Sequence, residues 1–255
     1  MPMTLQALPG WPEVQAGDDL VDFIHASAQA AEWAWAAGDI LVIAHKVVSK
    51  AEDRVVDLRT VQPGAEAQRL AAEVGKDAAK VELILQESRA IIRVKPPLAG
   101  RESVLICEHR LGWIMANAGI DESNVGAQQC VLLPLDPDHS ARRLRSGLQS
   151  RCGGPAPGII ISDTFGRPWR RGLVNVAIGL AGVPAVVDLT DQCDAHGRPL
   201  RATIPAFADE VAAAAGLLMA KAGGCPAVVV RGLAWQESNE SARDIIRPVA
   251  EDLFR

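Results

Sequence analysis

Residues 40–44, Ile-Leu-Val-Ile-Ala, form the stretch that decides the fold. An uninterrupted apolar run of this length is typical of a strand that is buried on both faces of a sheet. Before it, apolar residues recur at helical spacing between positions 20 and 35, behind a candidate helix cap at Asp18. Similar apolar runs at 158–161 and 226–230 predict two more buried strands. Helices and buried strands in this arrangement indicate an α/β protein.

The other segments complete one α/β assembly. Residues 63–88 predict two helices separated at Gly75, with Asp77 capping the second, and Asp138 opens a further helix that ends near residue 149. Short strands are expected at 90–94, 104–107, 111–116 and 131–133, and an alanine-rich helix at 205–222. Residues 45–50 are expected to form a polar loop at the exit of the first strand. We therefore expect one domain over 1–255, with a mixed sheet-and-helix fold of two lobes and a polar tail at 233–255.

Composition argues against several classes of protein. The 255 residues are 49% apolar and 22% charged, which is ordinary for a globular chain. The chain has 26 lysines and arginines against 31 acidic residues, and its net charge of −5 does not attract a nucleic-acid backbone. The longest charge-free run, 172–187, is too short to span a membrane, and residues 1–22 lack the pattern of a signal peptide. The sequence therefore predicts a cytoplasmic protein with no nucleic-acid or membrane partner.

Common catalytic motifs are missing from the sequence. There is no Walker P-loop, no G-x-G-x-x-G and no G-x-S-x-G. Polar side chains instead follow the apolar runs: Lys46 and Lys50 after the first, Asp163 with Thr164 after 158–161, and Asp121 in a loop. Carboxylates and hydroxyls without histidine select hard cations such as Mg²⁺ or Mn²⁺, and lysines beside such a cation suggest a phosphate ligand. These residue types predict a metal-dependent phosphate enzyme.

Each of these clusters also has a structural interpretation. An Asx-turn explains Asp121 better than metal binding does, and a loop cap explains Asp163 equally well. Two lysines spaced by four residues are usually a solvated pair, and His45 at a strand end is more often structural than catalytic. The arginines 167, 170 and 171 around Trp169 could form an anion clamp or a basic rim. Asp188, Asp191 and Asp194 could bind cations or form a polar turn, and the turn is favoured. Asp209 and Glu210 are best explained as first-turn acids that complement the helix dipole.

Seven longer motifs occur in order along the chain. They are Gly-Trp-Pro-Glu at 10–13, His-Lys-Val-Val-Ser-Lys at 45–50, Asn-Ala-Gly-Ile-Asp-Glu-Ser-Asn-Val at 117–125, Leu-Pro-Leu-Asp-Pro-Asp at 133–138, Ile-Ile-Ser-Asp-Thr-Phe-Gly-Arg-Pro-Trp-Arg at 160–170, Ala-Asp-Glu at 208–210 and Val-Val-Arg-Gly at 229–232. Together they resemble the motifs of the coenzyme F420:L-glutamate ligase family, in its stand-alone form. The segment at 160–170 is the most specific of them.

The resemblance implies a GTP-dependent ligase. Such an enzyme adds L-glutamate through γ-linkages to the deazaflavin precursor F420-0 by way of an acyl phosphate, releasing GDP and phosphate. The resemblance assigns GTP to Gly10, Trp11, Pro12, Glu13, His45, Lys50, Asn124, Met219 and Lys221, and two Mg²⁺ or Mn²⁺ ions to Asp121, Asp163 and Thr164. It gives catalytic roles to Lys50 and Asp163 and adds K⁺ as a further candidate cofactor. It also implies an intertwined homodimer.

Two positions depart from the family pattern. His45 stands where some members have serine, and Lys221 stands where some supply a metal-binding glutamine. The motifs that match best concern nucleotide and metal, so a ligase of the same mechanism acting on another carboxylate acceptor is an alternative. Lys221 would favour a second alternative, a GTP-binding regulatory protein without turnover.

Overall fold

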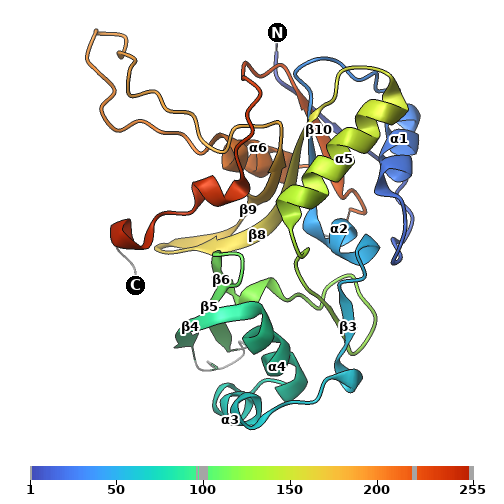
Figure 1. Cartoon of the computed structure of the whole chain (residues 1–255), viewed down its shortest axis with the longest axis vertical. Helices are drawn as coiled ribbons and strands as arrows, with labels where there is room; N and C mark the ends of the chain where they lie inside the picture. The colour runs from blue at the N-terminus through green and yellow to red at the C-terminus, as the bar shows by residue number, and fades with distance from the viewer. Residues whose placement is uncertain (1, 96, 98–102, 220–222, 253–255) are drawn as a thin grey trace.

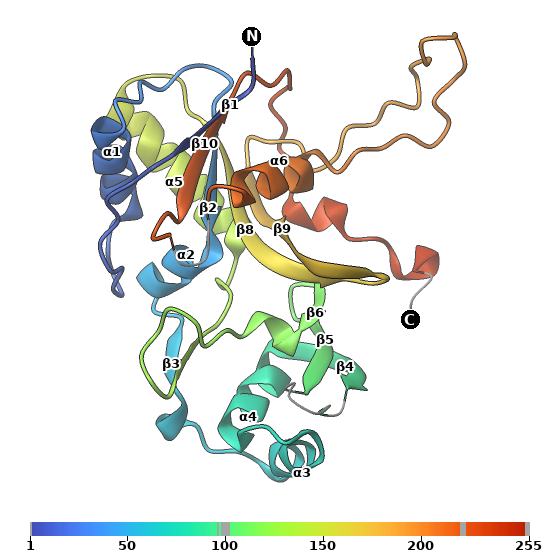
Figure 2. The ribbon, with the colours of Figure 1, turned by 180° about the vertical axis from the view of Figure 1, so that it is seen from behind.

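The computed structural model describes residues 2–95, 97, 103–219 and 223–252, which form a mixed α/β structure in two lobes (Figures 1 and 2). The larger lobe is built on a five-stranded sheet in the order β1-β10-β2-β8-β9. Its strands are β1 (Thr4–Ala7), β10 (Ala227–Arg231), β2 (Ile40–Ala44), β8 (Gly158–Arg167) and β9 (Arg170–Ala181). The pair β2–β8 is parallel and the other three pairs are antiparallel, so the α/β class is confirmed with a mixed sheet.

The three apolar runs lie side by side at the centre of this sheet. Ile40 to Ile43 of β2 are completely buried, as are Ile159 to Ile161 of β8. Helices cover both faces, which explains why these strands are apolar without alternation. The register pairs Ala44 with Ser162, so the polar residues that follow β2 meet those of β8 at one edge.

Three helices bury the two faces of the sheet. Helices α1 (Leu20–Ala30) and α5 (Pro137–Cys152) cover one face, and α6 (Phe207–Gly216) covers the other (Figures 1 and 2). The cap of α1 is Asp19, whose carboxylate accepts the N–H of Val21, and not Asp18 as expected. The cap of α5 is Asp136, while the expected Asp138 is buried and accepts the N–H groups of Leu180 and Ala242.

The smaller lobe has its own hydrophobic core. It contains α3 (Ala65–Val74) and α4 (Ala78–Glu87), separated at Gly75 as predicted, and a sheet of β4 (Ser88–Lys95), β5 (Val104–His109) and β6 (Ile114–Ala116). The short pair β3 (Val55–Asp57) and β7 (Gln129–Val131) lies where the chain passes between the lobes. Separate cores agree with the two-lobed expectation, while the assignment of 1–255 to one domain stays a prediction.

Three expectations about the elements were wrong. Residues 45–50 are not a loop, because β2 leads directly into α2 (His45–Ala51). Residues 162–164 do not end a strand, since β8 continues to Arg167 and forms a hairpin with β9, which the sequence analysis missed. Helix α6 begins at Phe207, and residues 220–222 of the expected helix lie outside the described residues. The tail contains two short 3-10 helices, η3 (Ala242–Ile245) and η4 (Val249–Glu251).

A buried carboxylate ties the two lobes together. Glu87, at the end of α4, accepts hydrogen bonds from Arg54 at 2.8 Å and from Arg110 at 3.0 Å. Arg54 and Arg110 also donate to backbone carbonyls of the crossing segment 133–135. Burial alone would raise the pKa of Glu87, but hydrogen bonds and the arginine charges lower it to about 2.

Among the described residues, no helix is long and apolar enough to cross a bilayer.

Candidate active site

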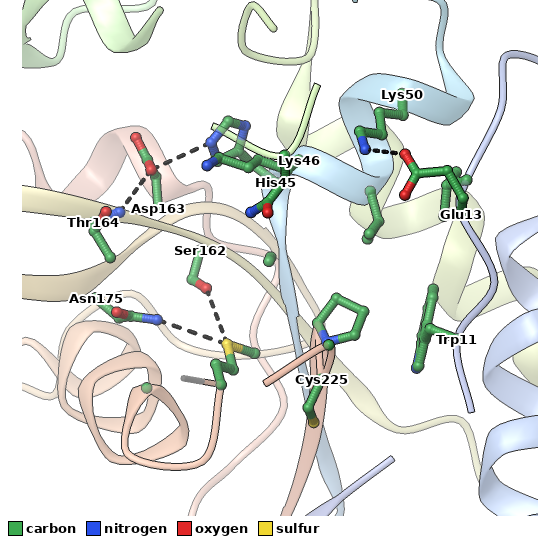
Figure 3. Close-up of a pocket in the computed structure, with 18 of the residues that line it drawn as sticks. Trp11, Glu13, His45, Lys46, Lys50, Ser162, Asp163, Thr164, Asn175 and Cys225 are labelled. Carbon is green, nitrogen blue, oxygen red and sulfur yellow. Dashed lines mark hydrogen bonds and ion pairs between the residues drawn. The ribbon is translucent and has the colours of Figure 1, made fainter. Parts of the chain in front are cut away.

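A cavity of about 430 Å³, here called the first cavity, opens at the edge of the sheet where β2 and β8 carry their polar residues. Its walls come from the N-terminal segment, α2, the β8–β9 hairpin and the end of α6 (Figure 3). Nine of the expected site residues line it: Trp11, Pro12, Glu13, His45, Lys50, Asn124, Asp163, Thr164 and Met219. Gly10 and Asp121 are not among its lining residues, and Lys221 lies outside the described residues.

Helix α2 explains how residues so close in sequence reach different partners. His45 and Ser49 lie one turn apart, with the imidazole Nδ1 at 3.3 Å from the serine Oγ. Lys46 and Lys50 are also one turn apart, so they share a face of the helix, and both line the first cavity. An extended strand would also put them on one face, but about 13 Å apart, whereas one helical turn separates them by about 6 Å.

Asp163 contacts the N-terminus of this helix. Its Oδ1 accepts the N–H of Thr164 at 2.6 Å and lies 3.3 Å from Nε2 of His45, although that contact makes no hydrogen bond (Figure 3). The imidazole is 2% exposed and the carboxylate 12%. Oδ2 accepts no hydrogen bond from the described residues, so this oxygen is available to a ligand.

Lys46 connects the first cavity with Asp121. Its Nζ lies 2.8 Å from Oδ2 of Asp121 and donates to the hydroxyl of Ser123, while Asp121 Oδ1 accepts the Ser123 N–H. Burial would raise the pKa of Asp121, but the bonds from Lys46 and Ser123 lower it to about 2. Asp121 therefore forms the expected Asx-turn, and its carboxylate is charged at neutral pH.

Lys50 projects from the next turn of α2 toward Glu13, in the part of the cavity that lies away from Asp163 (Figure 3). Its amine lies 2.5 Å from Oε1 of Glu13, and its side chain is 9% exposed whereas that of Glu13 is 71% exposed. Nearby, the indole Nε1 of Trp11 is buried without a hydrogen-bond partner among the described residues. A nearly buried cation with one exposed counter-ion is well placed to bind an anionic ligand.

One wall contains residues that the sequence analysis did not select. The amide of Asn175 on β9 and the hydroxyl of Ser162 on β8 both approach the sulfur of Met219, at 3.7 and 4.0 Å (Figure 3). The end of α6 is closely packed here, since a Cβ at Gly216 would lie 2.8 Å from the side chain of Asn175. Asparagine between two valines in a strand pattern was the available signal for this position.

The other expected groups lie elsewhere. Trp169 is 89% exposed at the tip of the β8–β9 hairpin, with Arg167 and Arg170 as the register pair beside it. Asp188 and Asp194 accept backbone N–H groups within their own turns, which confirms the turn interpretation. Asp209 is more than a first-turn acid, because its Oδ1 accepts the Ala177 N–H at 2.8 Å and burial raises its pKa.

The fold and site define a class of protein: a two-lobed α/β protein whose first cavity combines two lysines with a carboxylate at the end of a parallel strand pair. The family model described as "F420-0:Gamma-glutamyl ligase" matches residues 10–232. The chain belongs to this family.

Proteins named coenzyme F420:L-glutamate ligase match the chain over nearly their whole length. The chain is 43% identical to the coenzyme F420:L-glutamate ligase of Methanopyrus kandleri, over 99% of this chain and 98% of that protein. It is 42% identical to the protein of the same name from Methanothermobacter thermautotrophicus, over 100% of both. The Archaeoglobus fulgidus protein of that name is 40% identical, over 99% of this chain and 97% of its own length.

Proposed function

We propose that this protein is a GTP-dependent ligase that adds L-glutamate through γ-linkages to the coenzyme F420 precursor F420-0. Family membership and the names of the relatives support the glutamate donor and the acceptor. The use of a nucleoside triphosphate is supported by one observation, the lining of the first cavity. There, Lys50 and Lys46 lie on the wall formed by α2, and Asp163 lies on the β8–β9 hairpin. This arrangement suits a ligand rich in phosphate.

Amide formation requires an activated carboxyl group. The acceptor's terminal carboxylate would take the γ-phosphoryl group of GTP, giving an acyl phosphate and GDP, and the glutamate amine would then displace phosphate. In this scheme Lys50 binds phosphate oxygens and offsets the negative charge that develops during transfer. Lys46 lies one turn away and would hold a second part of the polyphosphate. The walls formed by Trp11 and Met219 would enclose the base.

The residues present fit a divalent cation. Among the described residues, Asp163 has one oxygen that accepts no hydrogen bond, and Thr164 adds a hydroxyl. Asp121 is ionised, but its oxygens are bound by Lys46 and Ser123, so it would reach the cation only if Lys46 moved to the phosphate. Within the described residues no group of three or more His, Cys, Asp or Glu side chains gathers. Mg²⁺ can be bound by one or two carboxylates together with substrate phosphates. When bound, the cation would neutralise the phosphate charge. A K⁺ ion is a further candidate.

A homodimer and a cytoplasmic location are part of the same proposal. The tip of the β8–β9 hairpin presents Trp169 and Leu173, 89% and 59% exposed, which would suit burial against a second copy. Light scattering after size-exclusion chromatography measures the mass of the particle directly. A monomer at micromolar concentration would contradict the homodimer.

Mass spectrometry tests the reaction. The purified protein is incubated with F420-0, L-glutamate, Mn²⁺ and either GTP, ATP or a GTP analogue whose β–γ bridge cannot be cleaved. We expect acceptor masses that increase by whole glutamyl residues with GTP alone, and one phosphate released for each residue added. GTP cleavage with a different carboxylate acceptor would support the alternative ligase, and binding without turnover would support the regulatory protein.

A further inference from the structure

A second cavity, of about 260 Å³, lies on the same hairpin as the first. Its walls come from the β5–β6 turn, from β8 and β9, from the start of α6 and from the C-terminal segment around η3. Figure 2 shows β6 beneath the hairpin and the C-terminal segment beside β9. None of the seven motifs along the chain assigns a ligand to this cavity.

The two cavities are neighbours, because residues that oppose each other in the β8–β9 hairpin line one cavity each. Asp163, which lines the first cavity, pairs with Val176, which lines the second. Phe165 lines the second cavity and follows Thr164, which lines the first. Directly opposed residues of an antiparallel pair have Cβ atoms about 5 Å apart. A ligand in the second cavity could therefore extend to Asp163.

The second cavity is mainly aromatic and aliphatic. Trp113 and Phe165 pack edge to face with their ring centroids 6.4 Å apart, and Val176 and Ile246 add aliphatic surface. Asp209 provides a half-buried carboxylate whose Oδ1 accepts the Ala177 N–H, while its Oδ2 accepts no hydrogen bond from the described residues. The C-terminal segment adds two charged residues to the lining, Arg247 and Asp252. Arg247 is exposed and also lies 3.9 Å from Glu251. These groups suit a flat, weakly polar ring that carries an N–H donor and is attached to an anionic chain.

We propose that the second cavity binds the deazaflavin ring of the acceptor. The inference rests on the proposed function and adds a location for the substrate that receives glutamate. The ring packs against Trp113 and Phe165, its pyrimidine N–H donates to Asp209, and its phosphate-bearing chain runs toward Asp163. The volume suits a ring system and not the whole acceptor, because pockets for complete small ligands start at about 300 Å³. Glutamate fits this cavity poorly, since its three charges would meet mostly apolar walls.

Binding of the deazaflavin nucleoside tests the inference. This probe has the ring and the sugar-alcohol chain but neither phosphate nor carboxylate, and its own fluorescence reports binding to the full-length protein. Ile246→Trp fills the cavity, and Ile204→Trp makes the same change at an exposed isoleucine, 52% accessible, that lines neither cavity. Asp209→Asn keeps an oxygen for the Ala177 N–H and replaces the other carboxylate oxygen with a donor.

We expect Ile246→Trp to abolish nucleoside binding and raise KM for the acceptor, with the affinity for GTP unchanged. Asp209→Asn should weaken nucleoside binding by about tenfold. Ile204→Trp should behave like wild type, and unchanged melting temperatures would exclude misfolding. Wild-type acceptor KM in both Ile246→Trp and Asp209→Asn would overturn the location of the ring while leaving the ligase activity established. Absence of any acceptor mass increase with the wild-type protein would instead overturn the proposed function.

Discussion

At the scale of single residues, the carboxylate of Asp163 has two different oxygens. Oδ1 is occupied by the Thr164 N–H and lies beside the imidazole of His45, whereas Oδ2 accepts nothing from the described residues. Because the side chain is 12% exposed and contacts the strand N–H of Thr164 and the buried imidazole of His45, it is held in one orientation. An oriented carboxylate with one available oxygen can bind a cation with little loss of side-chain entropy.

The change Asp163→Asn should therefore separate cation binding from structural support. The amide keeps an oxygen for the Thr164 N–H but loses the negative charge, so Mn²⁺ affinity and turnover should fall together while the melting temperature changes little. Electron paramagnetic resonance counts bound Mn²⁺. Asp194→Asn is the matched control, because Asp194 accepts backbone N–H groups in an exposed turn. Wild-type Mn²⁺ affinity in Asp163→Asn would refute the metal assignment.

The two lysines of α2 should differ in their effect on GTP. Among the described residues, Lys50 is bound only to the exposed Glu13, which phosphate can displace, whereas Lys46 is held by Asp121 and Ser123. Because a charge-assisted hydrogen bond contributes about 1.5–3 kcal/mol, Lys50→Ala should weaken GTP binding by roughly tenfold or more. Lys46→Ala should weaken it less. Calorimetric titration measures both, and equal losses would contradict the assignment.

At the scale of elements, α5 can lie on the sheet because β9 has a glycine beneath it. A Cβ added at Gly179 would lie 2.6 Å from the backbone carbonyl of Pro137, at the start of α5. Asp138 fixes this approach, since its carboxylate accepts the N–H of Leu180 at 2.7 Å. The helix therefore cannot move away without breaking a buried, charge-assisted hydrogen bond.

Gly179→Ala should destabilise the protein by about 1–3 kcal/mol, as overpacking of a rigid contact does. Denaturant unfolding followed by circular dichroism measures this loss. Gly154→Ala is the control, because its added Cβ would meet only the Cys152 carbonyl at 3.9 Å, and its effect should stay within about 0.5 kcal/mol. Equal stability of the two variants would show that α5 is free to shift.

At the scale of the whole molecule, the contact between the lobes depends on charge. Glu87 is 8% exposed and is bound by Arg54 and Arg110, and Nε2 of the completely buried His109 lies 3.3 Å from it. Burial, assisted by the two arginine charges, lowers the pKa of His109 against the opposing effect of Glu87. Arginines that bind both Glu87 and the crossing segment couple the position of the smaller lobe to the edge that carries the first cavity.

This cluster predicts the acid dependence of stability. The pKa of Glu87 is about 2 in the folded protein and 4.5 ordinarily, so its stabilisation is complete above pH 4.5 and is lost as the pH falls toward 2. His109 favours unfolding below about pH 6.5, because the unfolded chain takes up its proton more readily. Glu87→Gln should lower stability at pH 7 and flatten its decline between pH 4.5 and 2. Urea unfolding across this range measures the slope.

Glu66→Gln provides the control for this pH series, since Glu66 is an exposed glutamate in the first turn of α3. Its profile should follow that of the wild type. If the stability of Glu87→Gln fell with pH in parallel to the wild type, the cluster around Glu87 would not set the acid dependence of stability.

Local patterns were enough to predict the strands at 40–44, 158–161 and 226–230 and the helix break at Gly75, because an apolar run or a glycine acts on the backbone around it. The long motifs were enough to predict the family. The local pattern did not predict α2. The polar residues of this helix are stabilised by Glu13, Asp121 and Asp163, which are distant in the sequence. Only the tertiary structure made Asn175 part of the first cavity and Asp209 part of the second. Both depend on the register of β8 with β9 and on the packing of α6, which are long-range contacts that no local pattern encodes.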